Sequence, residues 1–248
     1  MRINNEWKDY QIIATGDGEK LERWKDVVLL RPDPQVIWHA QKPLHTIVRP
    51  DARYLRSSTG GGHWEYNRKI PDEWKVSWRD LTFSVKPMGF KHTGLFPEQA
   101  ANWAMMIDLI KNANRPINVL NLFAYTGGAT VACASAGASV CHVDAAKNMV
   151  ERARENVTLS GLADRPLDTL LTTVASLSNA KSNVAKSTMQ SSWIHQATAV
   201  APMARCGRLR RTSATLLNFV RKCFPTIHCL CLSTATQQDF NLQFYPTF

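Results

Sequence analysis

The stretch that decides the fold is INVLNLFAYTGG, residues 117–128. An apolar run of this length, followed by a turn signal, is typical of a buried strand. The two adjacent glycines at its end let a backbone turn tightly or approach a ligand closely. A helix of small residues is expected to follow as far as Ala136, with Gly137 closing it. The stretch therefore predicts a strand, a tight loop and a helix.

The same order repeats downstream. Residues 139–143 predict a second strand that ends at Asp144, and residues 147–159 predict a second helix that stops near Gly161. Upstream, apolar side chains recur at helical spacing over residues 97–111, which begin with a proline suited to a first helical turn. Alternation of strands with helices is the mark of a parallel α/β sheet.

The first 88 residues differ, with six of the eight tryptophans and many short apolar runs separated by Gly, Pro and Asp turn signals. That spacing predicts short strands and a small β-rich domain. The predicted strands are Val27–Leu30, Val36–Trp38, His45–Val48 and Leu81–Val85. We expect burial of the rings of Trp24, Trp38, Trp64, Trp74 and Trp78. Stacking of some of these rings on RNA bases is the alternative.

A carboxylate is expected beside the glycine loop. Asp144 lies seventeen residues after Gly127, at the predicted end of the next strand. In parallel α/β sheets, ligands bind beyond the carboxyl ends of the strands. A carboxylate there can accept both hydrogen bonds from a ribose diol. Loop and carboxylate together predict a nucleoside cofactor, and a generic turn with a solvent-facing Asp is the alternative.

The loop also distinguishes between nucleoside cofactors. A dinucleotide-binding fold uses Gly-x-Gly-x-x-Gly to seat a pyrophosphate at a helix N-terminus. Residues 121–128 lack that glycine spacing, which argues against a nicotinamide-dependent oxidoreductase. These residues instead resemble motif I of the class I methyltransferases, whose cofactor, S-adenosylmethionine, has no phosphate.

A longer resemblance covers residues 10–166. The segments GFKHTGLFPEQ, residues 89–99, and NVLNLFAYTGG, residues 118–128, resemble the bacterial 23S ribosomal RNA (cytosine) methyltransferase-like family of class I S-adenosylmethionine-dependent methyltransferases. In that family a Phe and a Gln before the cofactor domain help shape the methyl-donor site, the loop surrounds the methionine end and an Asp holds the ribose. The cofactor-binding residues that the resemblance implies here are Phe96, Gln99, Phe123, Tyr125, Thr126, Gly127, Gly128, Asp144 and Ala145. Without it, Phe96 would be assigned to the core and Gln99 to a helix surface.

The composition limits the classes of protein to which the chain can belong. We expect a soluble cytoplasmic protein, because no apolar run approaches the roughly 18 residues that cross a bilayer and the N-terminus lacks a signal-peptide pattern. The six cysteines show no framework spacing, so we expect no disulfides and no metal. Cys133 and Cys141 lie in apolar or small-residue stretches, where reduced thiols pack as small hydrophobes.

Basic charge is concentrated near the C-terminus. Residues 1–168 contain 22 Lys and Arg against 19 Asp and Glu, whereas residues 169–248 contain 8 against 1. The net charge of +10 would ordinarily indicate nucleic acid binding. Most of the excess, however, lies in a segment whose composition is abnormal for a folded protein.

Residues 169–248 lack the elements that complete a class I methyltransferase. Such a fold needs an acidic residue near the adenine and an Asp/Asn-Pro-Pro-aromatic loop that faces the transferred methyl, and neither is present. A reading-frame slip near residues 166–168 accounts for this. When the third base of each codon is read with the first two of the next, Trp193-Ile194 gives Asp, and residues 193–198 permit Asp-Pro-Pro-Ser-Tyr. Coding DNA without such a displaced frame over codons 166–200 would refute the slip.

The predicted fold class is α/β. A β-rich domain over residues 1–88 precedes an incomplete Rossmann-like methyltransferase sheet over residues 89–168, and an out-of-frame, largely disordered tail follows over residues 169–248. The predicted function is S-adenosylmethionine-dependent methylation of RNA, with ribosomal RNA as the substrate. Because the acceptor loop is missing, we expect activity to be abolished or severely reduced. The first strands of the sheet are expected to lack covering neighbours.

Other functions are weaker alternatives. The β-rich domain could bind RNA without catalysis through a set of basic residues, namely Arg31, Arg49, Arg68, Lys69, Lys86 and Lys91. In the tail, a basic patch at residues 205–211 could do the same. A zinc site among Cys206, Cys223, His228, Cys229 and Cys231 is disfavoured because no Cys-x-x-Cys pair is present.

Overall fold

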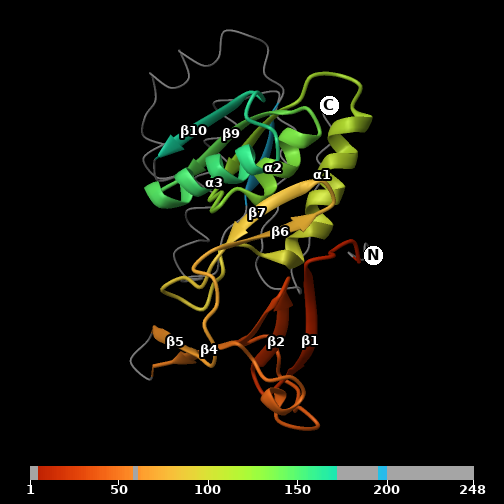
Figure 1. Ribbon diagram of the computed structural model, residues 1–248. Helices are drawn as coiled ribbons and strands as arrows, with labels where there is room; N and C mark the ends of the chain where they lie inside the picture. The colour runs from red at the N-terminus through yellow and green to blue at the C-terminus, as the bar shows by residue number, and fades with distance from the viewer. Residues whose placement is uncertain (1–4, 58–60, 172–194, 200–248) are drawn as a thin grey trace, which may run out of the picture. The chain divides into compact units, whose positions relative to one another are not determined.

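The computed structural model describes residues 5–57, 61–171 and 195–199 (Figure 1). The chain forms two compact units, Met1–Ala101 and Asn102–Phe248. This division falls within helix α1 (Ala100–Asn112), whereas the sequence placed a boundary after residue 88. The assignment of three domains stays a prediction, and most of the tail proposed for residues 169–248 lies outside the described residues.

The first unit contains a five-stranded sheet in the order β1-β2-β3-β4-β5 and a separate two-stranded hairpin, β6-β7. Strands β3 and β4 are parallel, and the other neighbours in both sheets are antiparallel. The strands are β1 (Tyr10–Gly16), β2 (Glu19–Trp24), β3 (Val27–Pro32), β4 (Ala52–Arg56), β5 (Gly62–Tyr66), β6 (Trp74–Trp78) and β7 (Leu81–Val85). The predicted β-rich character and the strands at residues 27–30 and 81–85 are confirmed.

Two-residue turns connect three of these strand pairs. Asp17 and Gly18 join β1 to β2 with φ of 53° and 76°, the two left-handed residues that a type I′ hairpin requires. Lys25, between β2 and β3, and Arg79, between β6 and β7, also have positive φ, 58° and 51°. Such turns match the right-handed twist of the strands they connect, so the strands pair directly beyond each turn. Strands β1 and β2 shift register once, between Ile12 and Ala14.

Two predicted strands are wrong. Residues 36–38 form no strand; backbone bonds from Gly18 N to Val36 O (3.0 Å) and from Asp17 N to Trp38 O (2.9 Å) tie them to the β1–β2 turn. Residues 45–48 overlap a short 3-10 helix, η1 (Leu44–Thr46). Leu44 and Ile47 both pack on the core cluster of Leu21 and Leu30. That i, i+3 spacing suits a helical turn and not an alternating strand.

The tryptophans divide into core and surface. Trp24 and Trp78 are fully buried, as predicted, and Trp64 and Trp74 are half-buried. The burial predicted for Trp38 is wrong, because its side chain is 51% exposed. Its indole Nε1 donates to Thr15, with the side-chain Oγ1 at 3.2 Å and the carbonyl O at 3.3 Å, and these polar contacts hold the ring at the surface.

The second unit is a parallel α/β sheet, as predicted. Its strands are β8 (Asn118–Leu122), β9 (Ser139–Asp144), β10 (Leu167–Leu171) and β11 (His195–Ala199), in the order β10-β9-β8-β11 and parallel throughout. Helix α2 (Gly128–Ser135) connects β8 to β9, and α3 (Lys147–Leu159) connects β9 to β10. Numbered along the chain, this order is 3-2-1-4, so the direction of strand addition reverses at β8. Open α/β sheets bind ligands at such a reversal.

Strand β11 is the one described element that lies wholly in the predicted tail. It pairs with β8, His195 opposite Asn118 and Ala199 opposite Leu122. Strand β8 therefore has neighbours on both sides, so the expectation that it would lack one is wrong. The physical reason is that an open parallel edge offers a row of backbone donors and acceptors to any segment that extends beside it.

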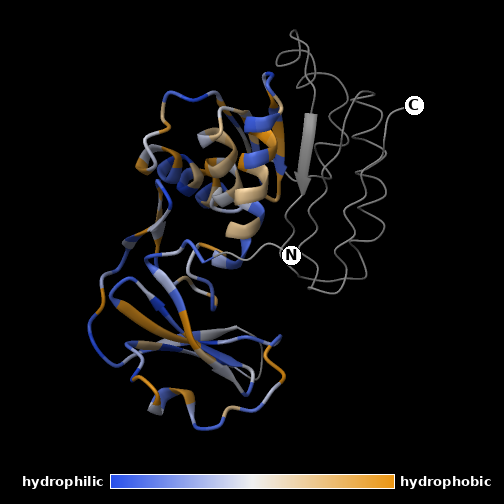
Figure 2. Cartoon of the chain, turned by 90° about the vertical axis from the view of Figure 1, so that its right-hand side faces the viewer, coloured by the Kyte–Doolittle hydropathy of each residue, from blue (hydrophilic) through white to orange (hydrophobic). Residues whose placement is uncertain are grey.

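The helices of this unit differ in character (Figure 2). Helix α2 is built from small residues that are almost all buried, among them Val131 and Ala132. Helix α3 carries charged residues and buries only one face, which includes Met149 and Ala153. Cys133 of α2 and Cys141 of β9 are free thiols, and burial raises the pKa of each to about 12. Both are thus unreactive at neutral pH.

A search of the described helices for a segment long and apolar enough to span a membrane finds none.

Candidate functional site

The loop that follows β8 has an unusual backbone. Phe123, Tyr125 and Gly127 all have left-handed φ, of 53°, 52° and 83°. For bulky residues such as Phe and Tyr this region costs about 1–3 kcal/mol each and persists only where the surroundings impose it. Two bonds impose it here, from Ala124 N to Val143 O at 3.1 Å and from Gly127 N to Ala124 O at 3.0 Å. Strain of this kind concentrates at binding sites.

Asp144 joins this loop to the tip of β9. Its Oδ2 accepts a hydrogen bond from Tyr125 N at 2.9 Å, and its Oδ1 accepts one from Ala146 N at 2.9 Å. Each carboxylate oxygen has two lone pairs, so both oxygens keep the capacity to accept from a ribose diol. The structure therefore brings the β8 loop and the predicted ribose-binding carboxylate into direct contact.

The two glycines are required by packing within the protein. A Cβ at Gly127 would lie 2.8 Å from Ala153 Cβ on α3, and one at Gly128 would lie 2.5 Å from Trp103 Cζ2 on α1. From the sequence, these glycines were expected to allow the approach of a ligand. The structure adds that they let the loop lie against two helices of its own unit, which fixes its position.

A buried polar network beneath the loop was not predicted. Asn121 of β8 and His142 of β9 are register partners in the sheet. Both side chains bond Thr130 of α2, with Asn121 Nδ2 and His142 Nδ1 each 2.9 Å from its Oγ1. On α3, Asn156 Nδ2 donates to Thr126 O at 2.8 Å. Polar residues within otherwise apolar strands were the only sequence signal.

Two atoms of this network have no hydrogen-bond partner among the described residues, Asn121 Oδ1 and His142 Nε2. Both side chains are essentially fully buried. Burial lowers the pKa of His142 to about 4, with Arg154 adding to the effect and Asp144 opposing it. The imidazole is therefore neutral at pH 7, and this network carries no charge beneath the loop.

We expect the second unit to lose stability as pH falls from about 6.5 to about 4. In this window the unfolded chain binds a proton at residue 142 and the folded chain does not, so acid favours unfolding. Urea unfolding followed by the helical circular dichroism signal measures this. His142→Gln should flatten the pH dependence, and the exposed control His45→Gln should retain it. Equal pH profiles for wild type and His142→Gln would contradict the assignment.

The other predicted site residues lie as follows. Thr126 is 1% exposed, Phe123 and Tyr125 are half-buried, and Ala145 is exposed beyond β9. Phe96 and Gln99 belong to the first unit, where Phe96 stacks edge-on against His92 and Gln99 N bonds Phe96 O in the 3-10 helix η2 (Pro97–Gln99). The cofactor-binding role of all nine residues stays a prediction.

Among the described residues, no group of three or more His, Cys, Asp or Glu side chains is placed to hold a metal ion. The cysteines and the histidine considered as zinc ligands all lie outside those residues.

Comparison with known proteins identifies relatives of part of the chain. No protein-family model matches it. An 87-residue segment is 38% identical to the ribosomal RNA large subunit methyltransferase K/L of Shewanella frigidimarina. The match covers 35% of this chain but only 12% of that protein. The chain therefore spans a small fraction of the curated relative that it matches.

Solved structures match over nearly the whole chain. An S-adenosylmethionine-dependent methyltransferase from Agrobacterium tumefaciens aligns with a TM-score of 0.80 and 26% identity, over 96% of this chain and 76% of that one. A putative methyltransferase of the same class from Streptococcus mutans aligns with a TM-score of 0.65 and 14% identity, over 95% and 64%. The α/β methyltransferase fold and the resemblance to ribosomal RNA methyltransferases are both confirmed.

Proposed function

We propose that this chain derives from an S-adenosylmethionine-dependent methyltransferase that acts on RNA, with ribosomal RNA as the substrate. The observation that carries the proposal is the contact between the β8 loop and Asp144 at the point where strand order reverses. The names of the relative and of the structural neighbours support the same chemistry.

In this proposal Asp144 accepts hydrogen bonds from the hydroxyls of the cofactor ribose while it keeps its bonds from Tyr125 N and Ala146 N. The strained loop, residues 123–127, holds the methionine end. For Phe96 and Gln99, a cofactor-binding role is what the family resemblance implies. S-adenosylmethionine supplies an activated methyl group when bound. The protein's part is to orient donor and acceptor in line, which accounts for most of the catalysis in such transfers.

We further propose that methyl transfer by this chain is abolished or severely reduced. Strand β11 lies beside β8, and the sequence after it reads VAPM, residues 200–203. It contains no Asp or Asn followed by two prolines. The acceptor-positioning loop of the family is thus missing from the sequence, which the proposed frame slip explains. Cofactor binding depends on other residues and is expected to persist.

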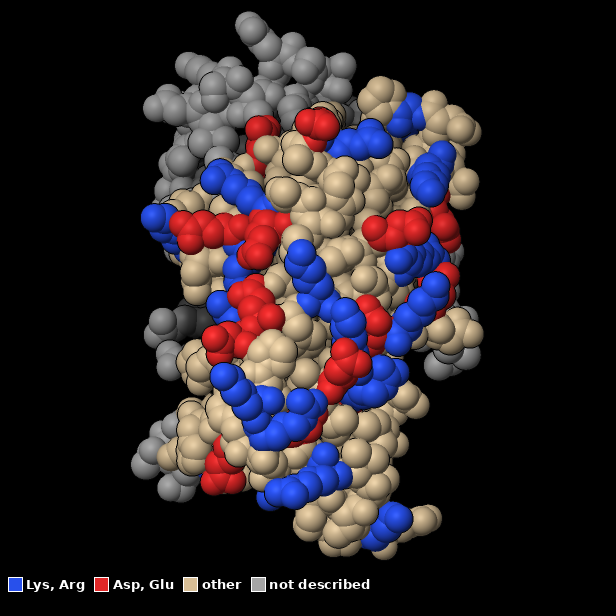
Figure 3. Space-filling model, in the orientation of Figure 1, with Lys and Arg blue, Asp and Glu red and all other residues tan. Residues whose placement is uncertain are grey.

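The alternative of non-catalytic RNA binding through six basic residues receives less support. Arg31 pairs with Glu22, Arg68 pairs with Asp51, and Lys86 lies 3.4 Å from Glu73. On the face drawn in Figure 3, basic and acidic side chains are intermixed over the surface. Three of the six basic residues are therefore paired with carboxylates, so the six together do not form one uncompensated basic surface.

Calorimetry with S-adenosylhomocysteine tests the proposal. We expect the full chain to bind this demethylated form of the cofactor and to show no binding of NADH. Asp144→Asn should weaken binding by about 10- to 100-fold, because it removes a charged acceptor and turns an N–H group toward a backbone donor. The exposed control Asp164→Asn should bind as the wild type does. Wild-type affinity in Asp144→Asn, or a preference for NADH, would refute the proposed cofactor site.

A further inference from the structure

An exposed aromatic ring lies at the tip of a turn in the first unit. Backbone bonds from Lys86 N to Thr93 O and from Met88 N to His92 O, each 3.0 Å, close the turn. Phe90 lies at its tip, with 67% of its side chain exposed. A large apolar ring presented in this way is not explained by packing in the core. A ring held on a closed turn is suited to binding, because little conformational freedom remains to be lost.

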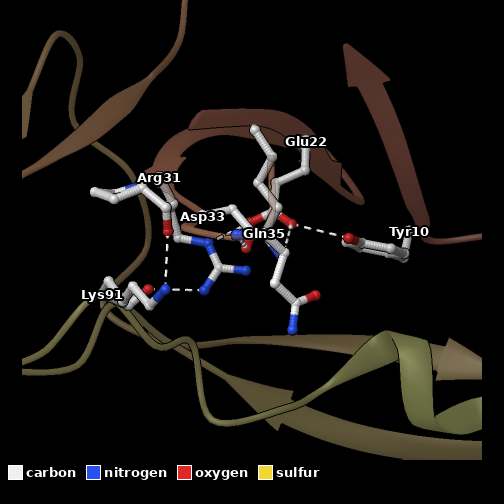
Figure 4. A network of polar contacts seen from close by, with 8 residues as sticks. Tyr10, Glu22, Arg31, Asp33, Gln35 and Lys91 are labelled. Atoms are coloured by element: carbon white, nitrogen blue, oxygen red, sulfur yellow. Dashed lines mark hydrogen bonds and ion pairs between the residues drawn. The ribbon is translucent and has the colours of Figure 1, made fainter. Parts of the chain in front are cut away.

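A buried ion pair anchors the turn to strand β3 (Figure 4). Arg31 Nη1 donates to Lys91 O at 2.7 Å, and Lys91 Nζ donates to Pro32 O at 3.0 Å. Arg31 is held in turn by Glu22, which also accepts from Tyr10 Oη at 2.9 Å. The side chains of Arg31 and Glu22 are 6% and 0% exposed. The turn therefore rests on a fixed polar network.

Positive charge beside the turn is only partly compensated. Glu22 neutralises Arg31, and Lys20 lies 3.4 Å from Asp33. Among the described residues, neither Lys91 nor Arg56 forms an ion pair with a carboxylate. Partial burial and the nearby charges of Arg56, Lys20 and Arg31 lower the pKa of Lys91, although Asp33 opposes them. A bound anion would relieve this repulsion.

We propose that Phe90, Lys91 and Arg56 form a docking site for a single-stranded RNA segment, with a base stacked on the Phe90 ring and a phosphodiester group held by the two cations. This inference rests on the proposed function for its choice of RNA. An aromatic face beside uncompensated cations is the combination with which proteins bind unpaired nucleotides. An acidic protein surface would use the cations but would not require the exposed ring.

Fluorescence anisotropy of a short unstructured labelled RNA, titrated with the full chain without cofactor, tests the site. Phe90→Ala should weaken binding about tenfold, as loss of one stacked base does, and Phe90→Trp should restore it. Arg56→Gln should reduce the salt dependence by about 0.7 in the slope of log K against log salt, as expected for one lost phosphate contact on a single strand. The matched controls are Ile37→Ala, with a side chain that is 85% exposed, and Lys75→Gln, which is exposed on β6.

Wild-type RNA affinity in both Phe90→Ala and Arg56→Gln would overturn the docking site, and so would equal losses in the controls. S-adenosylhomocysteine calorimetry on the same proteins separates this outcome from failure of the proposed function. Cofactor binding without any effect of residues 56 and 90 on RNA refutes the docking site alone. RNA binding that weakens on substitution of residues 56 and 90, in a chain that does not bind S-adenosylhomocysteine, supports the docking site and refutes the cofactor site.

Discussion

Replacing Glu22 with alanine is expected to destabilise the first unit by about 3–5 kcal/mol, because it leaves the Arg31 guanidinium buried without a counter-charge. Removal of one partner from a buried pair costs far more than the pair itself contributes. Urea unfolding followed by tryptophan fluorescence measures the change. Trp24 is a suitable reporter, since it is fully buried and its ring contacts Tyr10 at 4.7 Å between ring centroids.

Two further variants separate the ion pair from simple loss of packing. Tyr10→Phe removes only the hydroxyl that donates to Glu22 and should cost about 1–3 kcal/mol. The double variant Glu22→Leu with Arg31→Met should recover most of the stability that Glu22→Ala loses, because apolar residues of similar volume avoid the desolvation of both charges. It should stay about 1–3 kcal/mol below wild type, because the Tyr10 hydroxyl loses its acceptor and Lys91 O loses its donor. A double variant as unstable as Glu22→Ala would show that the stability loss does not come from the unpaired charge.

Replacing Gly127 with alanine is expected to abolish cofactor binding. The residue has a left-handed φ of 83°, and the added Cβ would meet Ala153 Cβ at 2.8 Å. The loop must then shift away from α3, and a shift of about 1 Å in a positioning group can cost 100-fold in function. We expect S-adenosylhomocysteine affinity to fall at least about 100-fold and stability to fall by about 3 kcal/mol.

Gly137 provides the matched control for this substitution. It closes α2 with a φ of 95°, and a Cβ added there would have no neighbouring atom within 4 Å. Gly137→Ala therefore introduces the left-handed strain alone, which costs about 1–2 kcal/mol, and should leave calorimetric binding intact. If Gly127→Ala binds the cofactor analogue as tightly as Gly137→Ala does, close packing on α3 is not what positions the loop.

The α/β unit was predictable because its signals are local. The apolar run that became β8, the glycines at the start of α2 and the helix Lys147–Leu159 each follow from short-range patterns. The β-rich unit was less predictable, because its apolar residues pack against surfaces that form only when the sheet folds. Leu44 and Ile47 lie over Leu21 and Leu30 from the 3-10 helix η1 and its end, a contact that no alternation in the sequence encodes.

Part of the candidate site was likewise predictable from the sequence, and part was not. Asp144 and the loop glycines were predicted because their spacing along the chain reflects one strand–helix–strand unit. The network of Asn121, Thr130 and His142 was not, because it depends on the register of β8 against β9 and on the side of α2 that faces them. Register is fixed by the whole sheet, and a single sequence does not reveal it.

The double attachment of Asp144 bears on how the loop after β8 is prepared for the cofactor that we propose it binds. Because this carboxylate bonds Tyr125 N and Ala146 N, both groups of the protein itself, the geometry of the recognition loop is established when the chain folds and does not await an incoming molecule. The entropic cost of ordering residues 123–127 is then met during folding, so a larger share of the contact energy appears as affinity.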